Sequence, residues 1–202
     1  MESENNMSED KYHHGDLKEM LIKNGIKLLK ESGCAGFSMR KLSAMCNVSH
    51  AAPYKHFKSK EEIIDAVMKY VLQELENALV DVAEKYKDNP QQLTIELGKQ
   101  YVKFMIDNPD YLKVLFLSDF ETKIMIKDGN IESEFTAFNI FKVNAIRAFK
   151  MCGIREDEYS RNIIAMWAMV HGIAIMIANK TVIYDGDVEK LVEDILMHNI
   201  KF

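Results

Sequence analysis

The sequence predicts an all-α fold, and three observations support this prediction. Apolar residues recur at the helical period of 3.6 over long stretches of the chain. Only three prolines and nine glycines interrupt the 202 residues, so there are few points at which a helix must end. With 48% hydrophobic residues, a chain of this length can bury a substantial core, as one large domain or two modest ones.

The first helix is predicted to begin at Asp16, which we expect to be its N-cap. Residues 1–10 are polar and acidic and are predicted to be a disordered tail, followed by an arm over 11–15. The helix should end near Gly33, because glycine readily adopts the left-handed conformation of a helix C-cap.

Residues 37–60 predict two short helices joined by a turn at 46–48, and therefore a helix-turn-helix. Ser38 and Ser49 occupy the two expected N-cap positions. Pro53 is at the fourth position of the second helix, where it removes the first ladder hydrogen bond and indicates that the helix begins in a tightened turn.

The charge is distributed unevenly along the chain. The net charge is −5, yet residues 11–60 contain ten Lys or Arg against three Asp or Glu. Residues 61–202 contain sixteen basic and twenty-four acidic residues. A basic segment of this kind is often only a solvated surface, but its coincidence with two capped helices favours a nucleic-acid-binding head on an acidic body.

Beyond the head, Ser59 and Glu62 have the spacing of a capping box and predict a connecting helix over 61–86. Asn89-Pro90 indicates a boundary, after which 87–202 should form a second helical domain. Helices are predicted over 91–107, 109–119, 131–151, 156–180 and 186–200, with breaks at 108–109, 128–130, 153 and 184–187.

The second short helix offers groups suited to DNA. Small residues such as Ala51 allow close approach to a groove, where a methyl group can contact thymine. Tyr54, His56 and Lys60 can donate hydrogen bonds to phosphates, although His56 could instead stabilise the helix end. His13 and His14 could reach DNA from the arm or could simply be solvated.

The pattern Ser-x-Ala-x-x-Tyr-x-His-Phe-x-Ser-Lys-Glu-Glu, from Ser49 to Glu62, resembles the recognition-helix signature of the TetR (tetracycline repressor) family. The arm over 12–17 and the run over 49–54 are similar to one branch of that family, whose C-terminal domain is of the WHG type. Trp167 and the pair His171-Gly172 match the Trp and His-Gly that give this domain its name.

The resemblance implies a three-helix DNA-binding domain and a longer helical domain for effector binding and dimerisation, in a homodimer that most often represses. It also implies a set of DNA contacts: Ser38, Arg40, Ser49, His50, Ala51, Tyr54, His56 and Lys60. Many members have Lys or Thr followed by Gly at positions 50–51, and Leu at position 53. These departures leave the operator sequence open.

Trp167 and His171 share a helix face, because they are four residues apart. They could be a buried pair in which His171 donates to a backbone carbonyl, or they could contact an effector. Small residues on another stripe, namely Ala165, Ala168 and Gly172, suit the close approach of a partner helix in a dimer.

The C-terminal domain is rich in methionine and phenylalanine, which can adapt to an apolar or weakly polar effector or can merely fill a core. We expect the effector to contact Met105, Phe116, Phe138, Met166, Trp167 and His171.

Other classes of function find little support. The sequence shows no catalytic constellation, cofactor motif or metal-ligand spacing, so we expect no enzyme, no cofactor and no metal. Three distant cysteines, an acidic N-terminus and the lack of an apolar run of about 18 residues predict a cytoplasmic protein without a membrane span. A helical interaction protein without operator binding remains the alternative, and repressor and activator are not distinguished.

Overall fold

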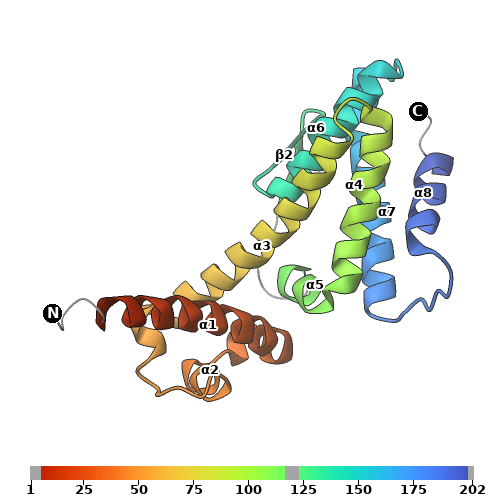
Figure 1. Cartoon of the computed structure of the whole chain (residues 1–202). Helices are drawn as coiled ribbons and strands as arrows, with labels where there is room; N and C mark the ends of the chain where they lie inside the picture. The colour runs from red at the N-terminus through yellow and green to blue at the C-terminus, as the bar shows by residue number, and fades with distance from the viewer. Residues whose placement is uncertain (1–5, 117–122, 200–202) are drawn as a thin grey trace. The chain divides into compact units, whose positions relative to one another are not determined.

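The computed structural model describes residues 6–116 and 123–199 of the chain. Within these residues the elements are α1 (Asn6–Gly36), α2 (Met39–Met45), the 3-10 helix η1 (Pro53–Lys55), α3 (Lys60–Lys85), α4 (Pro90–Asp107), α5 (Pro109–Phe116), β1 (Ile124–Lys127), β2 (Asn130–Ser133), α6 (Thr136–Met151), the 3-10 helix η2 (Glu156–Glu158), α7 (Tyr159–Ala178) and α8 (Val188–Asn199) (Figure 1). The fold is all-α with one small hairpin added, as the helical periodicity predicted.

The chain divides into two compact units. Among the described residues, unit 1 contains 6–71 and 113–116, and unit 2 contains 72–112 and 123–199. The division falls inside α3 and inside α5, so neither helix belongs wholly to one unit.

Unit 1 forms around the crossing of α1 with α3. A Cβ built on Gly25 would lie 2.7 Å from Cγ2 of Val67, so the absence of a side chain lets these two helices approach closely. Buried residues of α1, α2, α3 and the segments that join them complete the core; they include Leu21, Leu29, Phe37, Leu42, Phe57, Ile63 and Val67.

The first helix extends further than expected at its N-terminus. It begins at Asn6, so the predicted arm over 11–15 and the second half of the predicted disordered tail are helical, and Asp16 is not its N-cap. Residues 1–5 lie outside the described residues. The helix is interrupted at Gly33, whose φ of 61° and ψ of −178° are a conformation that glycine adopts readily, but it continues to Gly36 and does not end in the predicted left-handed cap.

In unit 2, α4 packs against α6, α7 and α8. The approach of α8 depends on Gly98, because a Cβ there would lie 2.7 Å from Leu196 Cδ1 and 3.2 Å from Val170 Cγ1. Asn89 caps α4 by accepting a hydrogen bond from the backbone N–H of Gln92 at 3.2 Å, and Pro90 occupies the first turn, where its missing N–H costs nothing.

The hairpin is the element that the sequence analysis missed. Residues 131–133, assigned to a helix over 131–151, form β2 instead, and that helix begins only at Thr136. The predicted break at 128–130 is a two-residue hairpin loop, in which Asp128 and Gly129 have φ values of 51° and 78°. Positive φ at both positions is typical of the type I′ turn that suits the twist of a hairpin.

Candidate functional site

The head presents its helix-turn-helix through α2 and η1. Ser38 precedes α2 in an extended conformation, and its carbonyl accepts a hydrogen bond from Leu42 N at 2.9 Å. The serine therefore occupies the predicted N-cap position, but its side chain makes no capping hydrogen bond. The cap is thus made by the backbone alone.

The turn after α2 is closed by a Schellman motif. Asn47 has a φ of 53°, its N–H donates to Ala44 O at 3.1 Å, and Val48 N–H donates to Ser43 O at 3.0 Å. Asparagine tolerates the left-handed conformation better than most residues, which explains why the chain can reverse here without glycine.

The segment after the turn is not the α-helix that the sequence predicted. Only Pro53–Lys55 is helical, as a 3-10 turn, and Ala52 N donates to Ser49 O at 3.0 Å just before it. Pro53 has no N–H to donate, so the hydrogen bond that an α-helix would make from position 53 to position 49 is absent. The tightened turn expected at Pro53 is present as η1, but the α-helix that was expected to continue from it is absent.

Most of the predicted DNA-contacting residues are at the surface of unit 1. The exposed ones are Arg40, Ser49, His50, Ala51 and Tyr54, whereas Ser38, His56 and Lys60 are half-buried. The rings of His50 and Tyr54 are stacked with centroids 5.8 Å apart and an interplanar angle of 5°. Because the two residues are four apart, the short turn brings both rings to one side of the segment.

Lys60 also makes a hydrogen bond within unit 1, because its Nζ lies 3.4 Å from the carbonyl oxygen of Ala35. Sequence analysis assigned it only to phosphate contact. Conversely, Lys41, Lys55 and Lys58 are exposed beside the predicted set but were not included in it. The charge bias of 37–60 is the signal that could have identified them.

The capping box at the start of α3 fixes the end of the head. Glu62 N–H donates to Ser59 Oγ at 3.2 Å, and Lys58 N–H donates to Glu62 Oε2 at 2.5 Å. The serine cap is confirmed, and the glutamate reaches back one residue further than in the usual reciprocal box. The pKa of the neighbouring Glu61 is lowered, first by its backbone hydrogen bond and then by Ser59.

In unit 2, Trp167 on α7 is the centre of an aromatic cluster. Its ring centroid lies 4.8 Å from that of Tyr101 and 5.2 Å from that of Phe138, with Phe135 and Phe141 each at 5.9 Å. The indole is only 8% exposed. The edge-on geometry of Phe135 and Phe138 is one that aromatic pairs favour.

One side chain of this cluster ties α4 to α7 through a polar contact. Tyr101 Oη and His171 Nδ1 are 2.8 Å apart, and the imidazole stacks on Trp167 with an interplanar angle of 8°. Burial lowers the pKa of His171 and raises that of Tyr101, so both groups are neutral at pH 7. The hydroxyl of Tyr101 is thus a polar partner of His171 that the sequence did not predict.

Tyr101 was absent from the predicted site. Its side chain is buried on the apolar stripe of α4, where a hydroxyl needs a polar partner. The helical period of 91–107 predicts the burial, but the sequence contains no signal that pairs position 101 with position 171.

The residues predicted to contact an effector fall into both units. Met105, Phe138, Met166 and Trp167 are buried in unit 2, and His171 there is half-buried. Phe116, at the end of α5, belongs to unit 1 instead.

The small-residue stripe on α7 is accessible in unit 2. Ala165 and Ala168 are exposed, and a Cβ built on the half-buried Gly172 meets no atom within 4 Å. Glu156–Ala178 is also the one described helical stretch that is long and apolar enough to cross a bilayer, on length and composition alone. Within α7, the exposed residues are Arg161, Ala165, Ala168 and Met176.

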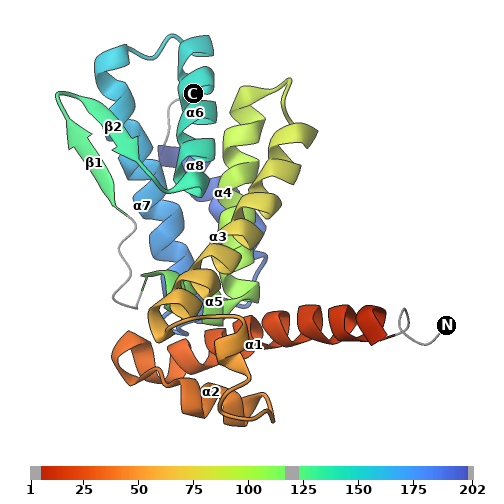
Figure 2. The same ribbon diagram turned by 90° about the vertical axis from the view of Figure 1, so that its left-hand side faces the viewer.

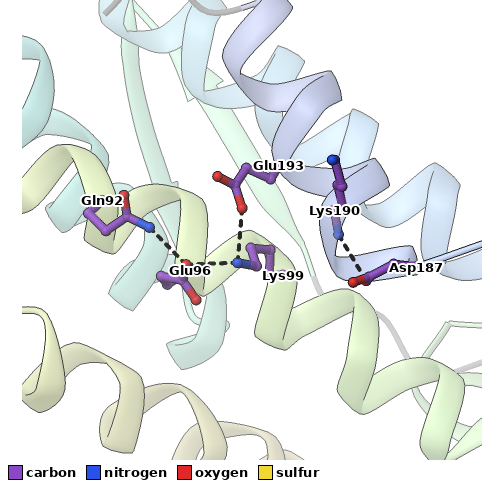
Figure 3. A network of polar contacts seen from close by, with 6 residues as sticks. All are labelled: Gln92, Glu96, Lys99, Asp187, Lys190 and Glu193. Atoms are coloured by element: carbon purple, nitrogen blue, oxygen red, sulfur yellow. Dashed lines mark hydrogen bonds and ion pairs between the residues drawn. The ribbon is translucent and has the colours of Figure 1, made fainter.

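Helix α8 is held to α4 by an ion-pair network (Figure 3). Lys99 Nζ lies 2.8 Å from Glu96 Oε1 and 3.1 Å from Glu193 Oε2, and Gln92 Nε2 donates to Glu96 Oε1 at 2.8 Å. The lysine side chain is only 14% exposed. Despite desolvation by burial, the two carboxylates raise the pKa of Lys99 to about 12.

The part of the chain that the structure describes contains no group of three His, Cys, Asp or Glu side chains placed to hold a metal ion. Cys34, Cys46 and Cys152 are free thiols.

Comparison with known proteins gives matches to the head and to the fold. Residues 21–67 match the family model described as bacterial regulatory proteins of the tetR family. The chain is 29% identical over 100 residues to the HTH-type transcriptional regulator YerO of Bacillus subtilis, which covers 48% of this chain and 34% of that protein. The match thus spans about a third of the relative's length.

Solved structures resemble the chain over nearly its whole length. The TetR family transcriptional regulator PfmR from Thermus thermophilus gives a TM-score of 0.62 at 17% identity, over 90% of this chain and 99% of that one. FadR from Bacillus subtilis, solved in complex with stearoyl-CoA, gives 0.65 at 12% identity, over 91% and 99%. At these identities the likeness shows the fold: an N-terminal helix-turn-helix followed by a helical C-terminal domain.

Proposed function

We propose that this chain is a cytoplasmic, ligand-responsive repressor, and the match of residues 21–67 to the model of the tetR family of bacterial regulatory proteins supports this proposal. It binds a pseudo-palindromic operator as a homodimer, and a small-molecule effector releases it. One observation carries the proposal: the family match coincides with the segment whose basic and hydroxyl side chains are exposed at α2 and η1. The named relatives regulate transcription, and we propose no catalytic activity.

The eight predicted contacts divide by chemistry. The serine hydroxyls of Ser38 and Ser49 and the charge of Lys60 suit phosphates, which position the head without reading sequence. Arg40 and the stacked His50–Tyr54 pair carry donors that can also reach base edges, and Ala51 can contact a thymine methyl. His56 is half-buried, so its part in DNA binding would be indirect or partial.

The proposed dimer uses the uncovered face of α7. Ala165, Ala168 and Gly172 permit the close approach of a partner helix, and Met176 continues the stripe at 40% exposure. A buried glutamate at this face would be desolvated without a partner charge. Ala168→Glu should therefore give monomers in sedimentation equilibrium, whereas Lys180→Glu, beyond the end of the stripe, should leave the dimer intact.

The proposed effector contacts the aromatic cluster of unit 2 through Met105, Phe138, Met166, Trp167 and His171, whereas Phe116 belongs to unit 1 and is not part of this proposed site. The neutral His171 and Tyr101 give this apolar site a polar group that could orient a ligand. FadR, which shares the fold, was solved with stearoyl-CoA, and this supports an effector with an apolar portion. The WHG-type character of Trp167 and His171-Gly172 stays a prediction.

Selection of bound duplexes from a random pool tests the proposal directly. The full-length protein should enrich two half-sites related by a dyad, one or more helical turns apart. Tyr54→Ala and Lys60→Ala should weaken binding to the enriched duplex, and Lys150→Ala, in unit 2, is a matched loss of charge that should not. Enrichment of no motif would instead support a helical interaction protein without operator binding.

A further inference from the structure

A lysine occupies the core-facing side of α1. Lys18 precedes the buried Leu21 by three positions and Gly25 by seven, so the three residues share one face of the helix. This face packs against α2, and at Gly25 against Val67 of α3, within unit 1 (Figure 2). An apolar residue is the usual occupant of such a position, yet Lys18 is charged and exposed. The lysine therefore lies at the edge of the core of unit 1.

This position brings the charge of Lys18 to the end of the segment that follows the turn of the helix-turn-helix. Its Nζ lies 5.8 Å from the centroid of the Phe57 ring. Phe57 is 3% exposed, and its N–H donates to the carbonyl oxygen of Pro53, the first residue of η1, at 3.0 Å. A cation over an aromatic face is attracted to the ring, and a long lysine side chain can keep its ammonium in water at the same time. The ammonium is thus held beside η1.

The ammonium of Lys18 has no carboxylate partner in the part of the chain that the structure describes. The next residue, Glu19, is paired with Lys23 at 2.6 Å. The nearest acidic side chain on α1 is therefore engaged elsewhere, and the charge of Lys18 stays available to an external anion.

The residues on either side of Phe57 add charge of the same sign. Lys55 and Lys58 are both exposed. Glu62, the carboxylate that comes back to this segment, accepts a hydrogen bond from the backbone N–H of Lys58 at 2.5 Å. Like charges close together repel each other, and an anion bound between them removes that repulsion. The end of η1 is consequently suited to a phosphate.

We propose that Lys18 binds a phosphate of the DNA backbone, so that the DNA-binding surface continues from α2 and η1 onto α1. This assignment rests on the operator binding proposed above and adds a contact to the eight predicted ones. A phosphate contact positions the head on the duplex without reading its sequence. Each phosphate that a lysine neutralises releases counterions, so the contribution of Lys18 falls as salt is added.

A purely structural role for Lys18 differs in what its loss would change. If the ammonium only held Phe57 in place, its removal would lower the stability of unit 1 and would leave the salt dependence of DNA binding unaltered. The loss of a phosphate contact changes the salt dependence itself. It also weakens binding to all duplex sequences by about the same factor.

Substitutions on α1 separate these two roles. Lys18→Met removes the charge and keeps an unbranched apolar side chain beside Phe57, Lys18→Gln removes the charge with a polar side chain, and Lys18→Arg keeps the charge. Lys27→Met is the matched control, because Lys27 is also exposed and makes no ion pair with the described residues. Lys27 lies nine positions further along, about two and a half turns at 3.6 residues per turn, and hence on the opposite face of α1.

The probes are two labelled duplexes of equal length, one enriched from the random pool and one with the same bases in scrambled order. Fluorescence anisotropy gives the affinity of the full-length protein for each duplex at several salt concentrations. Lys18→Met and Lys18→Gln should reduce the magnitude of the slope of log K against log salt by about 1 for each head, or about 2 for a homodimer. The ratio of the two affinities should not change.

The other variants complete the expected result. Lys18→Arg and Lys27→Met should both keep the slope of the original protein. Thermal unfolding followed by circular dichroism checks that each variant is folded, and it measures separately any contribution of Lys18 to the stability of unit 1.

Two results would overturn the assignment of Lys18 while operator binding stands. The first is a slope that both neutral variants leave unchanged although the original protein binds the enriched duplex. The second is an equal reduction by Lys27→Met, which would assign the effect to the net charge of the head and not to the position of Lys18. If the original protein binds neither duplex, the proposed operator binding fails and this contact fails with it.

Discussion

The segment over 38–60 and the cluster around Trp167 hold the two candidate sites, and they are built in opposite ways. In the head, side chains such as Arg40, His50 and Tyr54 are exposed and contribute little to the core of unit 1. In unit 2, Trp167 and Tyr101 are buried and hold α4 and α7 together. A residue of the head can therefore change function without changing stability, whereas a residue of the cluster changes both.

The largest expected effect is the loss of the indole at the centre of the cluster. Trp167→Ala should lower the free energy of unfolding by about 3–5 kcal/mol, because it leaves a cavity among four aromatic rings. Urea denaturation followed by circular dichroism measures it. A loss below about 1 kcal/mol would mean that the cluster is not the core of unit 2, and the contrast between the two regions would fail.

Next in size is the effect of Tyr54→Ala on DNA binding. The exposed ring makes few core contacts, so the free energy of unfolding should stay within about 0.5 kcal/mol of the original. The affinity for a selected duplex should fall by about 1–3 kcal/mol in a binding titration. If Tyr54→Ala unfolds unit 1 instead, Tyr54 contributes to stability, and the contrast between an exposed site in unit 1 and a buried site in unit 2 fails.

The ion-pair network of α4 and α8 offers a matched pair of lysines within unit 2. Lys99→Met should cost about 1–2 kcal/mol of unfolding free energy, because Glu96 and Glu193 lose a half-buried partner. Lys103, with a side chain 51% exposed, contacts Asp107 and Glu189, and Lys103→Met should cost less than about 0.5 kcal/mol. Equal losses in the two variants would show that the burial of Lys99 has no energetic consequence.

A smaller effect is expected at the cap of α3. Ser59→Ala removes the acceptor of the Glu62 N–H and should destabilise unit 1 by about 1 kcal/mol. Ser59→Asp preserves an acceptor at the cap and should retain most of the stability. Thermal unfolding of the three proteins compares them, and a Ser59→Asp variant as unstable as Ser59→Ala would argue against the cap.

The smallest effect is the pH dependence from His171. Burial lowers its pKa in the native state, so the unfolded state binds more protons in the window just below the ordinary value of 6.5. The free energy of unfolding should therefore be fully developed above pH 6.5 and should fall as the pH drops toward the lowered pKa. His171→Asn should reduce this slope relative to the original protein; a slope unchanged by the substitution would mean that the imidazole titrates normally in the fold.

The structure of the head could be predicted from the sequence in more detail than the contacts around Trp167, because caps and turns depend on residues close in the sequence. The N-cap position of Ser38, the side-chain cap of Ser59 and the positive φ of Gly33 each depend on residues within a few positions in the sequence. The extent of the second short helix could not be predicted as well. Pro53 was expected to tighten only the first turn, but the regular helix consists of three residues, with Pro53 at its first position.

The contacts of unit 2 are long-range, and this is why they were missed. The bond between Tyr101 and His171 joins residues 70 positions apart, and helical periodicity reports burial but not the identity of the partner. The hairpin is a different case, since Asp128-Gly129 between short apolar runs is a recognised hairpin signal. Its strands have only four residues each, which is too short for their alternating pattern to stand out. Residues 131–133 were therefore assigned to the helix that follows them.

The salt dependence of DNA binding tests the central claim most directly. The affinity of the full-length protein for a selected duplex is titrated at several salt concentrations, beside Tyr54→Ala and Lys60→Ala. A homodimer whose two heads neutralise several phosphates should give a slope of log K against log salt of about −4 to −8, and Lys60→Ala should reduce its magnitude. A slope near zero would contradict the assignment of 38–60 as the DNA-binding surface. The same conclusion would follow if Tyr54→Ala and Lys60→Ala changed neither the slope nor the affinity for the duplex.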